Sequence, residues 1–335
     1  MSTIRDVSNQ SGVSIATISR YLRNDSSLKI KEETKEKIDS AIKELNYVHK
    51  SKKAVGQKMR IGVVLAYTSQ KYSDPFFSTI LTGIEDECEK FNASVISVCQ
   101  CIDLEKPELL TQFCSQNLDG IIIMENINKS TLSVLEKHTK NIVFVDQYNP
   151  SYNNVGIDHF SACKKVMNCF IENGYKRIAY VGGAVQNVNF DDSYRTIAYR
   201  ESLRRAHIEY DESIYINCDW NIDLCAKLTK ELLLTKNRPD AIFAGSDTIA
   251  SVILGVLHEL NLKCPDDIGL IGFNGLAISS HYAPALTTLS VPMYEIGRIA
   301  FQRLHQLITK DEDTTISINL PTEITIRNSI KLKGE

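Results

Sequence analysis

The sequence predicts a small N-terminal all-α domain followed by an α/β core of two doubly wound parallel-sheet lobes. In the first fifty residues, short helical segments with polar caps surround a glycine. From about residue 60 onward, short β-branched runs alternate with helical stretches of roughly 12 to 18 residues, which is typical of parallel sheets covered by helices. At 335 residues the chain is also too long for one compact core.

The first elements expected are two short helices, one beginning at Thr3 and one within residues 12–22. Thr3 and Ser14 can cap them, since a hydroxyl accepts from an otherwise unpaired backbone N–H. Gly12 relaxes the turn between them. Two helices joined in this way form a helix-turn-helix, whose second helix enters the major groove of DNA.

A third, amphipathic helix is expected from about residue 32 to residue 45. An ordinary helical hairpin is the alternative interpretation of this region. In the three-helix arrangement, one set of apolar side chains forms the core, and four residues of the second helix face outward. The core set is Val7, Val13, Ile18, Leu22, Ile38, Ala41, Ile42 and Leu45, and the outward set is Ile15, Ala16, Thr17 and Arg20.

Charge divides the chain at the same place. Residues 1–60 hold 13 Lys+Arg and 7 Asp+Glu, a net charge of +6, so the remainder holds 25 and 34, a net charge of −9. A basic segment binds phosphates with release of counterions, whereas an acidic body is repelled by DNA. The N-terminal domain is therefore the expected DNA contact.

The core is expected to begin near residue 60, after a lysine-rich linker at residues 50–59. Because the predicted strand and helix units are too many for a single sheet, two lobes are expected. A ligand is expected in the crevice at the carboxyl ends of the strands. The runs predicted as strands are 61–65, 121–123, 142–145, 178–181, 241–244 and 268–273.

Several protein classes are not expected. No run of eighteen apolar residues and no secretory signal is visible, which predicts a cytoplasmic protein without membrane contact. The nine cysteines include no C-x-x-C pair and are expected to be reduced thiols, not metal ligands. Neither a complete dinucleotide loop, a P-loop nor a nucleophile elbow is present, so neither an enzyme nor a cofactor is expected. A sugar-transport binding protein could share the core, but it would need an export signal and would lack the helix-turn-helix.

The whole chain resembles the lactose/galactose repressor (LacI/GalR) family of transcription regulators. The resemblance rests on motifs spread from end to end of the chain. They are Asp6-Val7, Gly12-Val13-Ser14, Thr17-Ile18-Ser19-Arg20, Leu45-Asn46-Tyr47, Asp74-Pro75-Phe76-Phe77, Asp146, Arg195, Ser246-Asp247, Ile271-Gly272-Phe273-Asn274 and Pro284-Ala285-Leu286-Thr287-Thr288.

The resemblance implies a core similar to type I periplasmic sugar-binding proteins, behind a helix-turn-helix domain at residues 1–49. It also implies a homodimer or tetramer on a palindromic operator, with DNA affinity changed allosterically by a small molecule. A dimer is the default expectation. Within residues 60–335, the N-lobe is expected at about 60–157 and 291–321, and the C-lobe at about 158–290 and 322–332.

The linker departs from the family pattern. Family members usually continue with a hinge helix whose leucine wedges into the minor groove and kinks the DNA. Here residues 54–56 are Ala-Val-Gly, and no leucine stands where the wedge belongs. The linker resembles instead that of a subgroup regarded as galactose-operon repressors. The lysines expected to contact phosphate are Lys50, Lys52 and Lys53.

Roles in DNA recognition follow from residue type and position. Ile15 and Ala16 can offer only apolar contact, which suits thymine methyl groups, and Arg20 can pair with guanine. The other candidates are expected to contact the DNA backbone, which positions the protein without specifying sequence. They are Thr3, Ser14, Thr17, Asn24 and Tyr47, of which Tyr47 could instead pack against the third helix.

An effector site for a sugar needs groups that bind vicinal hydroxyls and an aromatic face for the pyranose ring. Trp220, the only tryptophan, matches the ring-stacking position of the family, although a lone tryptophan can also be a core residue. Aromatic residues near residue 70 could pack between lobes, and two of the aspartates could cap helices. The candidate effector-binding residues are Tyr67, Tyr72, Asp74, Phe76, Asp146, Arg195, Trp220, Ser246, Asp247 and Asn274.

The resulting functional hypothesis is a repressor of a sugar-utilisation operon, released from its operator by a small sugar, with galactose or a galactoside favoured. One guanidinium fork with several hydroxyl acceptors suits a neutral sugar better than a phosphorylated one. The alternative is a corepressor-type regulator of the same family that responds to a sugar phosphate or a phosphoprotein.

Overall fold

The computed structural model describes residues 3–22, 28, 30–45, 47, 58–66, 75–184, 189–310 and 314–334. The chain divides into two compact units, residues 1–57 and residues 58–335. Among the described residues, no helix is long and apolar enough to cross a membrane.

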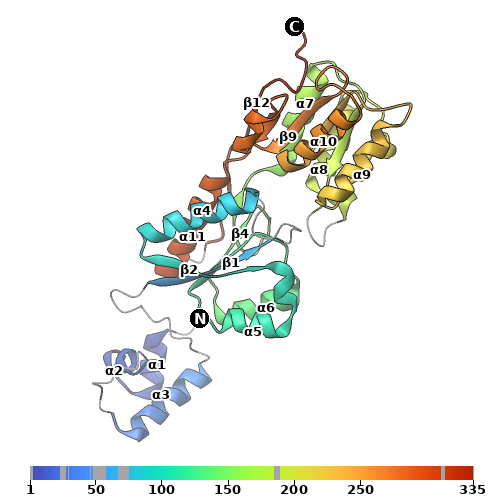
Figure 1. Ribbon diagram of the computed structural model, residues 1–335. Coiled ribbons are helices and arrows are strands. Elements are labelled where there is room, and N and C mark those ends of the chain that lie inside the picture. The colour runs from blue at the N-terminus through green and yellow to red at the C-terminus, as the bar shows by residue number, and fades with distance from the viewer. Residues whose placement is uncertain are drawn as a thin grey trace. The chain divides into compact units, whose positions relative to one another are not determined.

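The N-terminal unit contains three helices, α1 (Ile4–Ser11), α2 (Ile15–Leu22) and α3 (Glu32–Glu44) (Figure 1). Thr3 caps α1 in a capping box with Asp6, and Gly12 ends the helix at a φ of 68°. The Ser14 hydroxyl accepts from the Thr17 N–H at 3.2 Å, which confirms the second predicted cap. The helices pack on a small core of Val7, Ile18, Ile38 and Ala41, as predicted.

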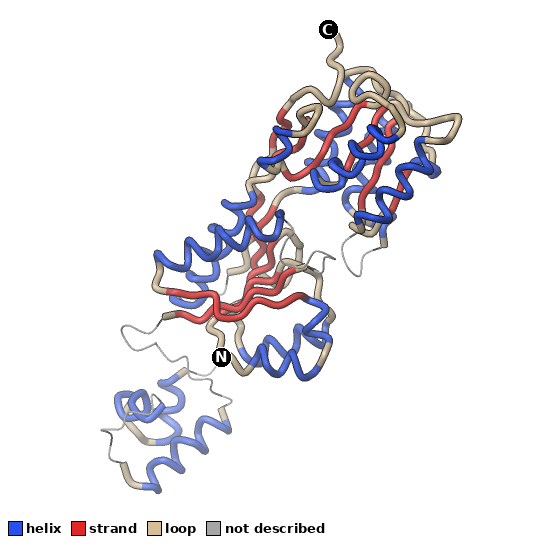
Figure 2. The backbone as a smooth tube through the Cα atoms, viewed as in Figure 1, coloured by secondary structure: helices blue, strands red, loops and turns tan. Residues whose placement is uncertain are grey.

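In the first lobe of the core, six parallel strands lie in the order β11-β5-β4-β3-β1-β2. Alternate strand residues enter two different hydrophobic clusters, because side chains point to opposite faces of a sheet. Helices α4 and α11 cover one face, and α5 and α6 cover the other (Figures 1 and 2). The strands are β1 (Met59–Leu65), β2 (Ala93–Gln100), β3 (Gly120–Ile123), β4 (Ile142–Val145), β5 (Asn153–Gly156) and β11 (Ser317–Asn319), and the helices are α4 (Pro75–Lys90), α5 (Pro107–Cys114), α6 (Lys129–His138) and α11 (Met293–Lys310).

The second lobe repeats this plan with the order β12-β10-β9-β8-β6-β7. All its neighbouring strands are parallel except β12, which pairs antiparallel with β10. The hydrophobic clusters again fall on two faces, one under α7 and α8 and one under α9 and α10. The strands are β6 (Ile178–Gly182), β7 (Tyr215–Asn217), β8 (Ala241–Ala244), β9 (Gly269–Asn274), β10 (Thr287–Ser290) and β12 (Glu323–Thr325), and the helices are α7 (His159–Glu172), α8 (Tyr194–Arg205), α9 (Ile222–Leu233) and α10 (Asp247–Glu259).

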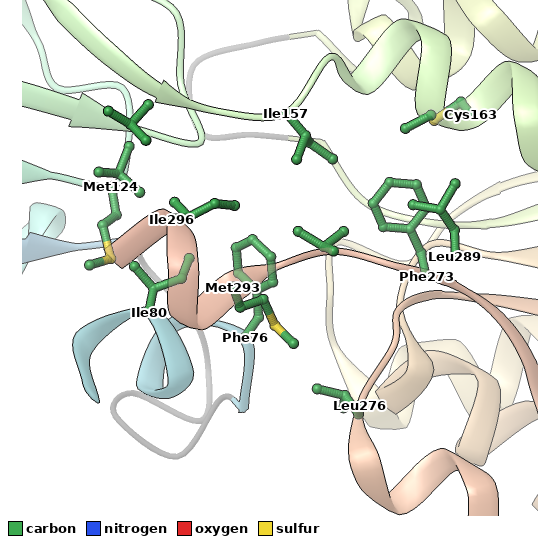
Figure 3. Packing of buried hydrophobic residues seen from close by; sticks show 14 of the residues in the cluster. Phe76, Ile80, Met124, Ile157, Cys163, Phe273, Leu276, Leu289, Met293 and Ile296 are labelled. Atoms are coloured by element: carbon green, nitrogen blue, oxygen red, sulfur yellow. The ribbon is translucent and has the colours of Figure 1, made fainter. Parts of the chain in front are cut away.

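The chain passes between the lobes three times, at residues 157–158, 291–292 and 320–322. The last two crossings arise because α11 and β11 return to the first lobe and β12 completes the sheet of the second. One hydrophobic cluster runs through this junction and joins Ile157 and Met293 to Phe273 and Leu276 (Figure 3). The predicted fold class, a helix-turn-helix domain with a two-lobed α/β core, is thereby confirmed.

Candidate functional site

The outward face of α2 is the candidate DNA-reading surface. Ile18 points into the core, while Ile15 stays 41% exposed and Ala16 and Arg20 are also exposed. Ile15 and Ala16 can offer apolar contacts to a DNA groove, and Arg20 can offer guanidinium contacts. The predicted base-reading residues are therefore all accessible.

The residues predicted to contact the DNA backbone occupy different places. Thr3 and Ser14 use their hydroxyls to cap helices, and the Ser14 and Thr17 hydroxyls lie 2.8 Å apart. Tyr47 is half-buried against the three-helix core, and burial raises the pKa of its phenol. This packing agrees with the alternative role for Tyr47. The other candidates lie outside the described residues: Asn24, Lys50, Lys52 and Lys53.

Trp220 lies in a tight bend after β7, at the carboxyl end of the second sheet. Asp219 and Trp220 both have left-handed backbone conformations, with φ of 50° and 54°. The indole rests against two glycines, since a Cβ on Gly183 would lie 2.7 Å from its Nε1 and one on Gly245 would lie 3.0 Å from the ring. Its Nε1 donates to the Ala184 carbonyl at 2.9 Å. The half-buried ring is thus held in one orientation at the end of the sheet.

Arg195 stands in the first turn of α8, directly beside this ring. Its Nη1 donates to the Gly245 carbonyl at 2.7 Å. Its guanidinium carbon lies 5.2 Å from the centre of the Trp220 ring and 4.5 Å from that of the Phe273 ring, within cation–π distance. Burial lowers the pKa of Arg195, but Tyr180 and other neighbouring groups more than offset this, so the guanidinium stays charged.

Asp146 reaches the same place from the first lobe. It follows β4 with a φ of 57°, and its Oδ1 lies 2.9 Å from Nε2 of His159, the first residue of α7. The His159 ring stacks on Phe273 with a centroid distance of 6.3 Å. Asp146 also helps to raise the pKa of Arg195, so its carboxylate lies close enough to stabilise the charged guanidinium. Asp158, not Asp146, caps α7.

Sequence reasoning missed His159 and Phe273 as members of this cluster. Phe273 lies inside a predicted strand, where an aromatic residue indicates burial, and His159 follows the crossing segment as an isolated histidine. All three residues belong to the second lobe, whose fold brings the start of α7 and the end of β9 to Arg195 in α8. Phe273 had two signals, its place in the Ile271-Gly272-Phe273-Asn274 motif and its position at the end of a predicted strand, whereas His159 had only its position at the start of a helix.

The remaining effector candidates are less clustered. Ser246 caps α10, with its hydroxyl accepting from the Ile249 N–H at 3.1 Å. Asn274 ends β9 with a φ of 106° and is 8% exposed. Phe76 is also 8% exposed and packs in the hydrophobic cluster near Met293, which agrees with lobe packing (Figure 3). Tyr67, Tyr72 and Asp74 lie outside the described residues.

Asp247, another candidate, begins α10 and is completely buried. Its Oδ2 accepts from the Leu276 N–H at 2.6 Å and its Oδ1 from the Thr288 hydroxyl at 2.5 Å. Gly272 leaves room for it, since a Cβ there would lie 2.2 Å from Oδ1. Asp247 therefore ties α10 to the loop after β9, and its contact with an effector stays a prediction.

Asp247 makes stability depend on pH. Burial raises the pKa of Asp247 to about 6 from 3.8, although Thr288 and Leu276 lower it. The folded protein therefore binds this proton more tightly, so its stabilising contribution is full below pH 3.8 and is lost as the pH rises through about 6. The shift corresponds to about 3 kcal/mol.

We expect Asp247→Asn to remove this dependence. The amide can still accept from the Leu276 N–H and can donate to the Thr288 hydroxyl, so both contacts remain, with the Thr288 hydroxyl accepting where it now donates. Urea denaturation between pH 4 and pH 7 should show the variant gaining stability over the wild type as the pH rises. If the free energies of unfolding of the two proteins change with pH in parallel, Asp247 is not the source of the pH dependence.

Taken together, the cluster offers a guanidinium fork, the half-buried indole of Trp220 and a carboxylate at the carboxyl ends of parallel strands, with the fully buried Phe273 packed against the guanidinium. These groups can bind the hydroxyls and the apolar face of a small polyol. Within the part of the chain that the structure describes, no group of three or more His, Cys, Asp or Glu side chains could hold a metal ion.

Comparison with known proteins agrees with this architecture. Residues 3–49 match the bacterial regulatory proteins of the lacI family, and residues 167–330 match a periplasmic binding protein-like domain. The regulator RegA of Clostridium saccharobutylicum is 30% identical over 325 residues, which cover 92% of this chain and 93% of RegA. The ribose operon repressor of Halalkalibacterium halodurans is 28% identical and is matched over 99% of this chain and 98% of its own length.

Among solved structures, a complex of the transcriptional regulator CelR with cellobiose has the same fold, with a TM-score of 0.73 and 24% identity over 98% of this chain and 100% of that one. The two matched regions follow each other in the order that the structure shows, and the relatives align along almost their whole length. The chain therefore belongs to the lacI family of bacterial regulatory proteins.

Proposed function

We propose that the protein is a sequence-specific DNA-binding repressor of a sugar-utilisation operon, released from its operator when a small sugar binds the core. The observation that carries the proposal is Arg195, held against Trp220 and Phe273 with Asp146 beside it. In this proposal residues 1–49 bind DNA, residues 50–59 link the domains, and residues 60–335 bind the effector and dimerise.

The effector chemistry follows from the cluster. Arg195 can donate two parallel hydrogen bonds to vicinal hydroxyls, Asp146 can accept from another, and Trp220 can stack on the apolar face of a sugar ring. A single guanidinium fork suits a neutral sugar better than a phosphorylated one, which needs clustered cations. The names of two similar proteins, a ribose operon repressor and a regulator in complex with cellobiose, support a sugar as the class of effector. Galactose or a galactoside is the specific candidate that the linker resemblance favours.

Operator recognition rests on the exposed face of α2. Two copies of this surface in a homodimer would read the two halves of a palindromic operator, since a two-fold axis relates both. Arg20 is proposed to pair with a guanine, and Lys50, Lys52 and Lys53 are proposed to contact phosphates.

We expect Arg20→Ala to weaken operator binding by about 1 to 3 kcal/mol and to relax the preference at one base pair. Loss of a lysine from the linker should instead weaken binding to every sequence equally and reduce its salt dependence. Binding to a series of operators with single base substitutions separates the two effects. If Arg20→Ala weakens all operators equally, Arg20 does not read a base.

A thermal-shift screen tests the effector proposal. Galactose, ribose and cellobiose are compared with galactose 6-phosphate, because a ligand of the folded state raises the melting temperature by mass action. We expect a neutral sugar to raise it and the sugar phosphate to leave it unchanged. If only the sugar phosphate raises the melting temperature, the result contradicts release by a neutral sugar and supports the corepressor alternative.

A further inference from the structure

Tyr180 in β6 carries a buried hydroxyl that lacks a hydrogen bond of standard geometry, although Arg195 lies close enough to act on it as a donor. The side chain is 0% exposed, and its hydroxyl makes no such hydrogen bond with any residue that the structure describes. The ring itself is well packed, stacked on Tyr215 at 5.0 Å and edge-on to Phe243 at 5.2 Å. A phenylalanine would fill the same space without an unpaired polar atom, so packing alone does not account for a tyrosine.

Gly182 explains where this hydroxyl lies. Residues 180 and 182 share one face of the strand, and a Cβ on Gly182 would lie only 2.4 Å from the Tyr180 oxygen. The tyrosine therefore extends along β6 over the glycine, toward the carboxyl end of the sheet. That is the end at which Arg195 and Trp220 lie.

Arg195 is the charged group that most affects this phenol. Burial raises the pKa of Tyr180 to about 12, and the Arg195 guanidinium is close enough to lower it in part. In return, Tyr180 is the group that contributes most to raising the pKa of Arg195. The guanidinium has five N–H donors, and the Gly245 carbonyl accepts from its Nη1.

We propose that Tyr180 is a positioning residue of the effector site, whose hydroxyl accepts from Arg195 and limits the directions in which the guanidinium faces a sugar. The inference rests on the proposed function in one respect, that Arg195 contacts the effector. The geometry places the two groups together: the Tyr180 hydroxyl lies over Gly182, a Cβ on Gly245 would lie 3.1 Å from the Gly182 Cα, and the Gly245 carbonyl accepts from Arg195.

Tyr199 provides a matched control. It belongs to the same aromatic cluster and is equally buried, but its hydroxyl donates to the Ile178 carbonyl at 2.6 Å, at the other end of β6. Tyr199→Phe removes a satisfied structural hydrogen bond at the start of β6. Tyr180→Phe removes the hydroxyl beside Arg195. Both variants remove one phenolic hydroxyl. They differ in where that hydroxyl lies and in whether it makes a hydrogen bond of standard geometry.

The first measurement needs no sugar. Trp220 is the only tryptophan, and the Arg195 guanidinium lies over its ring, so its fluorescence reports how Arg195 is held. We expect Tyr180→Phe to change the emission of Trp220 while the melting temperature stays equal to or above that of the wild type. Tyr199→Phe should lower the melting temperature and leave the emission unchanged. An unchanged emission in Tyr180→Phe would overturn the positioning role, whatever sugars bind.

The second measurement uses whichever of galactose, ribose or cellobiose raises the melting temperature of the wild type. Tyr180→Phe should weaken its binding about tenfold, as expected for loss of one hydrogen bond to a charged group. In an Arg195→Lys background the same substitution should have little further effect, because the lysine lacks the fork that Tyr180 orients. Equal weakening in both backgrounds, or none in either, would contradict the inference. If no sugar binds the wild type while Tyr180→Phe still changes the emission, the proposed function fails and the contact with Arg195 stands.

Discussion

Replacement of Gly297 by alanine should lower the free energy of unfolding by about 3 kcal/mol, because an added methyl group has no space at the crossing of α4 and α11. A Cβ on Gly297 would lie 2.0 Å from the Ile80 carbonyl oxygen, and one on Gly83 would lie 2.2 Å from the Tyr294 carbonyl oxygen. The two helices therefore touch backbone to backbone at both points. Backbone atoms cannot move aside as a flexible side chain can, so the helices must separate.

Gly255 is the control for this prediction. It lies in the middle of α10, and a Cβ there would meet nothing within 4 Å. Gly255→Ala should raise the free energy of unfolding by about 0.5 to 1 kcal/mol, since alanine favours the helix. Urea denaturation of both variants provides the comparison. If Gly297→Ala is as stable as the wild type, the close helix contact is wrong.

Arg195→Ala should abolish the response to sugar and leave operator binding intact. The substitution removes the guanidinium fork and also the cation–π contacts with Trp220 and Phe273, so we expect at least a hundredfold loss of sugar affinity, about 3 kcal/mol. Titration of sugar against the fluorescence of Trp220, together with operator binding by anisotropy, measures both activities on one protein.

Arg200→Ala is the matched control for Arg195→Ala. Arg200 belongs to the same helix, but it pairs with Asp191 at 2.6 Å and lies over the Tyr210 ring instead of Trp220. We expect this variant to bind sugar like the wild type. If both arginine variants lose sugar binding equally, the loss reflects damage to α8 and not removal of an effector contact.

Of the inner strands, β5 and β10 could not be predicted, because Asn153–Gly156 and Thr287–Ser290 contain few apolar residues. The other inner strands could be predicted, because residues buried on both sides form continuous β-branched runs. The edge strands could not. In β2 most residues are only partly buried and Ile96 is 38% exposed, and β7, β11 and β12 are only three residues long. Their place in the sheets depends on pairing with distant strands, which local sequence does not encode.

The candidate site was predictable where a motif marks a residue and unpredictable where burial decides its role. Arg195 and Trp220 carry the family motifs and lie together as expected. Asp247 has the same kind of signal, but its carboxylate is turned inward onto Leu276 and Thr288. Tyr180 has no signal, because its position follows from the missing side chain of Gly182. The roles of Asp247 and Tyr180 depend on contacts between residues that are distant in the sequence, which local sequence does not encode.

Operator release by sugar tests the central claim most directly. Palindromic DNA selected by the full-length protein from a random pool is labelled, and its dissociation constant is measured by anisotropy at one fixed salt concentration with and without the sugar found in the thermal-shift screen. We predict that the sugar weakens operator binding at least tenfold in the wild type and not at all in Arg195→Ala. Unchanged or tighter operator binding in the presence of a sugar that binds the core would contradict the account.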